Sequence, residues 1–182
     1  MLFSRARTIP FQLRLLQAED ASQLFYTIHT NRAYLRQWLP WVDGTLNVED
    51  SLAFIEDTIT QYKQGECVVA AIWCENRIVG CIGLNNIQTF HQKAEIGYWL
   101  SRNYQEKGII TRACRQMINY AFDELKLNRV EILVAEKNRR SRSVAERLGF
   151  EEEGLLRNYY RHRQEFVDVV IYGMLKKYWK SS

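Results

Sequence analysis

The sequence predicts one α/β domain in which a mixed, mostly antiparallel central sheet carries helices on both faces. The first observation is size: 182 residues, of which 47% are apolar and 25% charged, suffice for one compact domain with a sizeable core. The second is periodicity, because apolar runs of strand type and of helix type both occur. The third is their order: early strands follow one another closely, whereas central strands alternate with helices, which predicts a mixed sheet. No repeat or linker divides residues 1–182.

The amino-terminal part begins with a strand and continues with two helices. Residues 11–16 alternate apolar and polar side chains, as a strand does. Residues 18–39 have apolar positions at helical spacing. Asn47, followed by acidic residues, predicts the start of a helix over 48–64, and Gly65 predicts its end.

The rest of the chain alternates between the two types of element. In chain order we expect a hairpin over 66–87 that turns at 75–77, a strand over 93–100, a long helix after Gly108, a strand over 129–135, a short helix over 141–149, and strands over 151–160 and 165–179.

Charge and cysteine usage narrow the functional classes. The net charge of +4 suits an anionic ligand but is too small to predict direct DNA binding. The four cysteines show no CxxC spacing, so neither a disulfide framework nor a metal site is expected. No secretion signal and no apolar run long enough to cross a bilayer are found, so we expect no membrane association and a cytoplasmic location.

The stretch YQEKGIIT places Gln105, Lys107 and Gly108 just before a helix with one apolar stripe. The first turn of a helix has amide N–H groups without partners, and the helix dipole adds a partial positive charge there. A glycine lets an anion approach the backbone closely. The stretch therefore predicts a diphosphate site, with an ordinary loop glycine as the alternative.

This stretch resembles the acetyl-CoA loop of the GNAT superfamily of N-acetyltransferases, whose pattern is [RQ]-x-x-G-x-[GA]. Gln105 and Gly108 match that pattern, whereas Ile110 replaces the usual Gly or Ala. The segments KAEIGYWLSRNYQEKGIIT, NRVEILVAEKNRRSRSVAERLGFEEEG, DVVIYGMLKKYW and YLRQWLPWVD are similar to the ribosomal-protein branch of the RimJ/RimL type. The resemblance implies the GNAT fold, with a central sheet splayed in its middle, acetyl-CoA as co-substrate and no metal.

The resemblance also implies site residues. Glu95 is the candidate base, acting directly or through a water; the alternative is a surface carboxylate paired with Lys93. The family often uses a tyrosine as the general acid at the position where Ala145 stands here. Ser141 is the candidate acid near the thiol, with a helix N-cap as the alternative. Asn138 would bond the pantetheine or the acetyl group, with a simple turn residue as the alternative.

Further positions complete the expected site. The expected cofactor-binding residues are Trp99, Leu100, Gln105, Lys107, Gly108, Ile109, Ile110, Thr111, Asn138 and Ser141. Trp38, Trp41 and Tyr160 are expected to wall the acceptor side, with core packing as the alternative for the tryptophans.

Several functions remain open at the level of sequence. The leading hypothesis is transfer of an acetyl group to the N-terminal amine of a protein, with a ribosomal protein as the acceptor. The first alternative keeps the cofactor but changes the acceptor to a polyamine, amino acid or drug. The second is a non-catalytic CoA-binding or RNA-binding module that uses the basic cluster KNRRSR. Many relatives form dimers, so a homodimer is also an open alternative.

Overall fold

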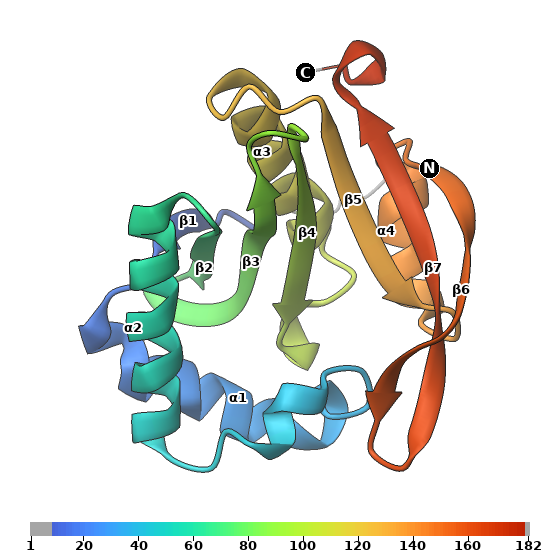
Figure 1. The fold of residues 1–182 in the computed structure, drawn as a ribbon. Helices are drawn as coiled ribbons and strands as arrows, with labels where there is room; N and C mark the ends of the chain where they lie inside the picture. The colour runs from blue at the N-terminus through green and yellow to red at the C-terminus, as the bar shows by residue number, and fades with distance from the viewer. Residues whose placement is uncertain (1–8, 181–182) are drawn as a thin grey trace, which may run out of the picture.

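The computed structural model describes residues 9–180, which form one seven-stranded sheet in the order β1-β2-β3-β4-β5-β7-β6 (Figure 1). The start of the chain, where we expect no secretion signal, lies partly outside the described residues. The strands are β1 Gln12–Leu15, β2 Val68–Cys74, β3 Arg77–Gln88, β4 Lys93–Leu100, β5 Arg129–Ala135, β6 Glu151–His162 and β7 Glu165–Leu175. The α-helices are α1 Ala21–Leu35, α2 Val48–Gln64, α3 Ile109–Asp123 and α4 Arg139–Arg147.

The centre of the sheet is split between β4 and β5. These strands run parallel, whereas the other neighbouring pairs in the described sheet are antiparallel. Pairing between β4 and β5 begins at Lys93 and Arg129 and ends at Glu95 and Glu131, although both strands continue beyond that point. Figure 1 shows the two ribbons diverging toward their carboxyl ends. The predicted mixed, mostly antiparallel sheet that is splayed in its middle is therefore confirmed.

Helices cover both faces of the sheet and enclose two apolar cores (Figure 1). One core joins α3 and α4 to residues from both halves of the sheet, including Ile96 of β4 and Ile132 of β5. The other core joins α1 and α2 to the opposite face of β2 and β3. This division follows from strand geometry, because successive side chains of a strand point to opposite faces.

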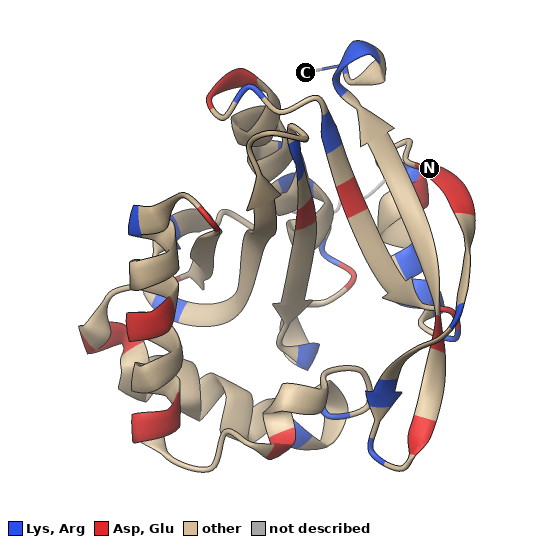
Figure 2. Ribbon diagram, viewed as in Figure 1, with Lys and Arg blue, Asp and Glu red and all other residues tan. Residues whose placement is uncertain are grey.

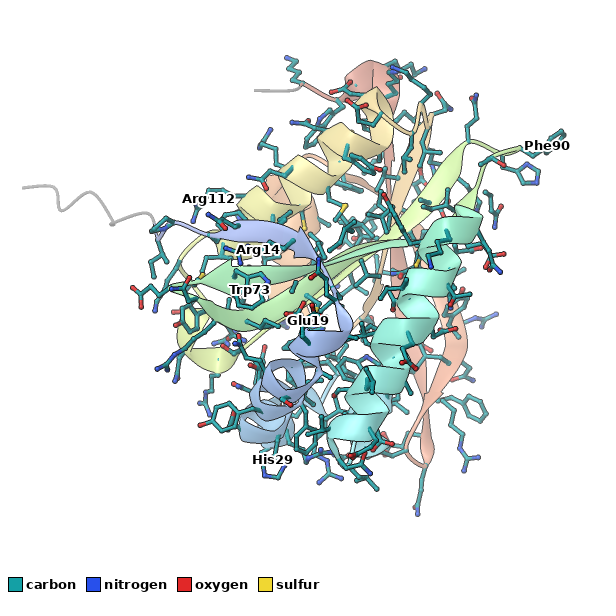
Figure 3. The ribbon with its side chains drawn as sticks, turned by 90° about the vertical axis from the view of Figure 1, so that its left-hand side faces the viewer. Arg14, Glu19, His29, Trp73, Phe90 and Arg112 are labelled. Carbon is teal, nitrogen blue, oxygen red and sulfur yellow. The ribbon has the colours of Figure 1, made fainter. Side chains whose placement is uncertain are left out.

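The amino-terminal edge of the sheet is protected by side chains rather than left flat. Arg14 of β1 lies over the ring of Trp73 on the neighbouring strand, with the guanidinium 4.9 Å from the ring centroid (Figure 3). A charged residue on an edge strand disfavours pairing with another chain. At the other end of the view, Phe90 projects from the β3–β4 turn and is 91% exposed.

The start and end of α2 and the turn of the β2–β3 hairpin lie where the sequence predicts them. The Asn47 side chain accepts a hydrogen bond from the Asp50 amide at 2.9 Å, which caps α2. Gly65 ends this helix in the left-handed conformation at φ 75°. The β2–β3 hairpin turns at Glu75 and Asn76, which both have positive φ, as a two-residue turn between twisted strands requires.

Three predicted boundaries are wrong. Strand β7 ends at Leu175 rather than at residue 179, because a 3-10 turn, Lys176–Tyr178, follows. Helix α1 ends at Leu35 rather than near residue 39, because a separate 3-10 turn, Pro40–Asp43, follows. Helix α4 begins at Arg139, and its cap is Asn138, whose side chain accepts from the Ser141 amide at 3.2 Å. Ser141 is therefore inside the first turn, and its alternative role as the helix N-cap is excluded.

Candidate functional site

Two cavities share part of their lining near the carboxyl end of β4. We call the first the α3 cavity, because the start of α3 lines it, and its volume is about 510 Å³. We call the second the α2 cavity, which lies between α2 and the sheet and has a volume of about 710 Å³. Leu39, Tyr98 and Trp99 line both. The two cavities therefore adjoin beside the carboxyl end of β4.

The α3 cavity gathers most of the cofactor-binding residues expected from the sequence. Its lining includes Trp99, Leu100, Gln105, Gly108, Ile109, Ile110, Thr111, Asn138 and Ser141. Trp38, expected on the acceptor side, also lines this cavity. The charged residues among its lining are Glu106, Arg140 and Arg147.

The loop before α3 bends in a way that suits an anion. Gly108 has φ 68° and ψ 8°, a left-handed conformation, and a side chain built on it would meet no atom within 4 Å. Glu106 also has a positive φ of 61°. Consecutive turns of this kind gather backbone N–H groups into an anion-binding concavity. The Arg112 amide donates to the Gly108 carbonyl at 3.2 Å, and this is where the hydrogen-bond pattern of the helix begins. The amides of the turn before Arg112 therefore have no partner within the helix.

The charged side chains around this loop form hydrogen bonds within the protein that the sequence does not indicate. Lys107 Nζ donates to the Asn103 carbonyl at 2.6 Å and lies 5.1 Å from the centroid of the Tyr104 ring. Lys107 does not belong to the cavity lining, so its ammonium supports the loop. Arg140 of α4 donates to Gln105 Oε1 at 2.7 Å and to Glu106 Oε1 at 3.2 Å, which joins the two sides of the cavity.

A hydroxyl pair lies at the wall that the two cavities share. Tyr98 Oη is 3.0 Å from Ser141 Oγ, where either atom can donate, and 3.2 Å from the Ser141 carbonyl. Burial raises the pKa of Tyr98 far above its usual value, more than the Ser141 hydrogen bond lowers it. Tyr98 therefore stays protonated and holds Ser141 in place. When Tyr98 donates to Ser141 Oγ, the Ser141 proton is free to bond a group in the cavity.

Tyr98 is absent from the residues expected from the sequence. Its place in the strand KAEIGYWL indicates a face of β4 but not which helix lies opposite it. The contact with Ser141 depends on α4, which is 43 residues further along the chain. The family's usual tyrosine position holds Ala145, which is fully buried here, so a phenol reaches this region from β4 instead.

Glu95 lies where β4 and β5 separate. Its neighbours Ala94 and Ile96 point into the α3 core, so Glu95 points to the face covered by α1 and α2. Glu95 Oε1 accepts a hydrogen bond from Asn86 Nδ2 at 2.9 Å. It lines neither cavity, and the Cα of Gly97, which lines the α2 cavity, is about 7 Å further along the strand.

The alternative ion pair of Glu95 with Lys93 is not formed. Lys93 Nζ lies 3.3 Å from Glu131 Oε2 on β5, and Arg129 Nε lies 2.6 Å from Glu131 Oε1. Glu131 is thus a buried carboxylate with two cations, next to Glu95 in the register. Figure 2 shows these acidic segments of β4 and β5 side by side above the split.

The α2 cavity differs from the α3 cavity in charge and chemistry. The charged residues among its described lining are Asp50 and Asp57, and Figure 2 shows acidic segments along α2. Trp41 and Trp99 both line it, with ring centroids 6.1 Å apart. Tyr160, expected on the acceptor side, lines neither cavity. Burial raises the pKa of Tyr160, which lies in β6.

Two kinds of feature, a metal-binding cluster and a membrane-spanning helix, are not found among the residues that the structure describes. Within 9–180, no three His, Cys, Asp or Glu side chains are grouped to hold a metal ion. No helix in the same range is both long and apolar enough to cross a membrane.

Comparison with known proteins gives a consistent result along the chain. The family described as Acetyltransferase (GNAT) domain matches residues 11–151. The putative ribosomal N-acetyltransferase YdaF of Bacillus subtilis (strain 168) is 38% identical, with 92% of each chain covered. The ribosomal-protein-serine acetyltransferase of Escherichia coli (strain K12) is 28% identical, with 90% of this chain and 92% of that protein covered. The spermidine N(1)-acetyltransferase of the same strain is 28% identical, with 80% and 75% covered.

Solved structures agree with the sequence relatives. A crystal structure of a probable acetyltransferase has a TM-score of 0.88 at 38% identity, covering 93% of this chain and 94% of its own. The L7/L12 alpha-N-protein acetyltransferase RimL, solved with coenzyme A, has a TM-score of 0.87 at 26% identity, covering 93% and 96%.

Proposed function

Because this chain belongs to the GNAT family of acetyltransferases, we propose that it transfers the acetyl group of acetyl-CoA to the N-terminal amine of a protein, with ribosomal proteins as the acceptors. The observation that carries this proposal is the pair of cavities that meet at Tyr98 and Trp99. Acetyl transfer requires two substrates to approach from opposite sides, and their correct alignment supplies a large part of the rate enhancement. A cytoplasmic site of action belongs to the proposal.

The α3 cavity fits the donor. Its two lining arginines, the start of α3 and the open space beside Gly108 suit the diphosphate, together with the backbone of Ile109, Ile110 and Thr111. Trp99 and Leu100 belong to the part of β4 that has left β5, so we propose that their backbone groups bond the pantetheine. The side-chain oxygen of Asn138, Oδ1, accepts the hydrogen bond that caps α4. The side-chain NH₂ group of Asn138 is therefore left to bond acetyl-CoA.

The protein's contribution to the chemistry can be assigned to three residues. The donor supplies an activated acetyl group. We assign Glu95 to accept the proton of the incoming ammonium through a water, because its carboxylate lies away from both cavities and has one hydrogen bond from Asn86. We assign Ser141, held by Tyr98, to give a hydrogen bond to the leaving sulfur. Since a thiol has a pKa of about 8.5, its departure needs little acid assistance.

A small polyamine is the second candidate acceptor. Two carboxylates line the α2 cavity, and one relative is named a spermidine acetyltransferase. An acidic lining favours any cationic amine, so this observation does not separate the two acceptors. The distinction comes from the experiment below.

Two measurements test the proposal in sequence. In the first, acetyl-CoA at 100 times its Kd should stabilise the chain by about 2.7 kcal/mol. For a domain of this size that corresponds to a rise in Tm of about 5–10 °C. No shift at saturating acetyl-CoA would contradict an acetyl-CoA-dependent enzyme.

In the second, thiol release is measured with N-terminal peptides of ribosomal proteins, spermidine and free amino acids as acceptors. We expect the highest kcat/KM for peptides. Faster turnover of spermidine than of every peptide would replace the first candidate by the second.

A further inference from the structure

We propose that the α2 cavity receives the first residue of the acceptor and selects a bulky apolar side chain, of the size of leucine, methionine or phenylalanine. The inference rests on the proposed function, which it makes more specific. It differs from the acceptors in the printed names of the relatives, which are serine, alanine and spermidine.

The position of the α2 cavity places an acceptor residue inside it. The acetyl group must lie where the two cavities meet, at Tyr98 and Trp99, because donor and acceptor react there. A primary amine at that wall has its own carbon atoms on the α2 side. The side chain of the first residue therefore extends from Trp99 toward α2.

The interior of the α2 cavity is apolar and larger than a small side chain requires. Its buried apolar lining residues are Leu24, Ile28, Cys67, Val69, Cys81 and Ile82, and Ser51 and Thr58 are buried polar residues of the same lining. The cavity of about 710 Å³ lies within the range of pockets that enclose small ligands. A leucine or phenylalanine side chain would remove more of this apolar surface from water than a serine or alanine side chain would.

The acidic residues of the α2 cavity are already engaged by the protein. Asp50 Oδ2 accepts hydrogen bonds from the amides of Leu46 and Asn47 at 2.7 and 3.1 Å. Asp57 accepts a hydrogen bond from Gln61 Nε2 at 2.6 Å. Asp57 is exposed and Asp50 is half-buried, so neither belongs to the buried interior of the cavity. They favour the approach of an ammonium, but the apolar interior does not favour the second charge of a polyamine.

Ser51 supplies a second, independent observation that points to a ligand. It lies on α2, lines the cavity and is 1% exposed, yet its Oγ has no hydrogen-bond partner among the described residues. A buried hydroxyl without a partner destabilises a protein. A polar atom of the bound acceptor, such as the carbonyl of its first residue, would satisfy it. An apolar side chain beside a carbonyl describes an amino-terminal residue better than it describes a polyamine.

The experiment uses the full chain, acetyl-CoA and peptides of one sequence that differ only in the first residue. The kcat/KM for thiol release is measured with Ala, Ser, Leu, Met and Phe at that position, and with spermidine. We expect Leu, Met and Phe to exceed Ala and Ser by about tenfold or more. Equal values for the peptides, or a preference for Ala or Ser, would overturn the inference while the proposed function stands. A preference for spermidine over every peptide would overturn the inference and also replace the proposed protein acceptor by a polyamine. If none of the tested acceptors gives thiol release, both the inference and the proposed function are overturned.

Two variants of Ser51 connect the preference to the cavity. Ser51→Leu fills the cavity from α2 and should abolish the preference for large residues. It should lower kcat/KM for the Ala peptide severalfold, because the hydroxyl is lost, and lower it by a larger factor for the Leu, Met and Phe peptides. Thr60→Leu is the matched control, because Thr60 is an exposed residue of the same helix that lines neither cavity. Ser51→Ala keeps the shape and should lower kcat/KM for the Leu peptide severalfold, with an equal or higher Tm. An unchanged preference in a folded Ser51→Leu variant would contradict the assignment.

Discussion

Gly108 gives the sharpest test of the loop that we assign to the diphosphate. At φ 68° any side chain costs about 1–2 kcal/mol of backbone strain. Since an added Cβ would contact no atom within 4 Å, neither a clash nor new packing changes this value. Gly108→Ala should therefore lower the free energy of unfolding by about 1–2 kcal/mol. The corresponding fall in Tm is about 2–8 °C for a chain of this length.

Gly65 provides a matched control for this prediction. It has φ 75°, ends α2, and likewise has open space around an added Cβ. Gly65→Ala should cause the same loss of stability in urea unfolding, without an effect on coenzyme A affinity in calorimetry. Gly108→Val should also weaken that affinity about tenfold or more, because the side chain occupies the space of the anion. If coenzyme A affinity changes equally in Gly108→Val and in Gly65→Ala, or changes in neither, the assignment of the loop is refuted.

Three further predictions concern the chemistry and the ion pairs. Glu95→Gln should lower kcat about a hundredfold with nearly unchanged affinity for acetyl-CoA, and an unaltered kcat would make Glu95 structural. Tyr98→Phe should lower kcat severalfold, and a double-mutant cycle with Ser141→Ala should show strong non-additivity; additive losses would mean that the two hydroxyls act separately. The hydrogen bond from Arg129 holds the pKa of Glu153 below its usual value, so Glu153 stabilises the fold at neutral pH. This contribution is lost as the pH falls through the lowered pKa, and the difference in urea midpoint between the native chain and Glu153→Gln should shrink below about pH 4; a constant difference would contradict the ion pair.

Local features of the fold could be predicted from the sequence, because each depends on neighbouring residues. Asn47 and Gly65 delimit α2 through contacts within a few residues, and the Gly108 turn precedes α3 for the same reason. The split of the sheet followed from the resemblance to the GNAT superfamily. Periodicity alone does not indicate that β4 and β5 part after Glu95.

Three features of the site could not be predicted, because two depend on which of several local partners a side chain selects and one depends on a distant contact. Lys107 was expected beside the diphosphate, but its ammonium bonds the Asn103 carbonyl within its own loop. Ser141 was given a capping alternative that Asn138 fulfils. The pairing of Tyr98 with Ser141 requires knowledge of how α4 packs against β4, which no local pattern contains.

Helix α3 packs beneath both halves of the divided sheet, and its residues Cys114 and Met117 share one core with Ile96 and Ile132. Because the side chains of this helix pack against strands on both sides of the split, they tie the positions of the two halves to one another. Substitutions on the buried face of α3 should alter how far the strands stand apart, and thus the rate of the enzyme, from positions that no substrate touches.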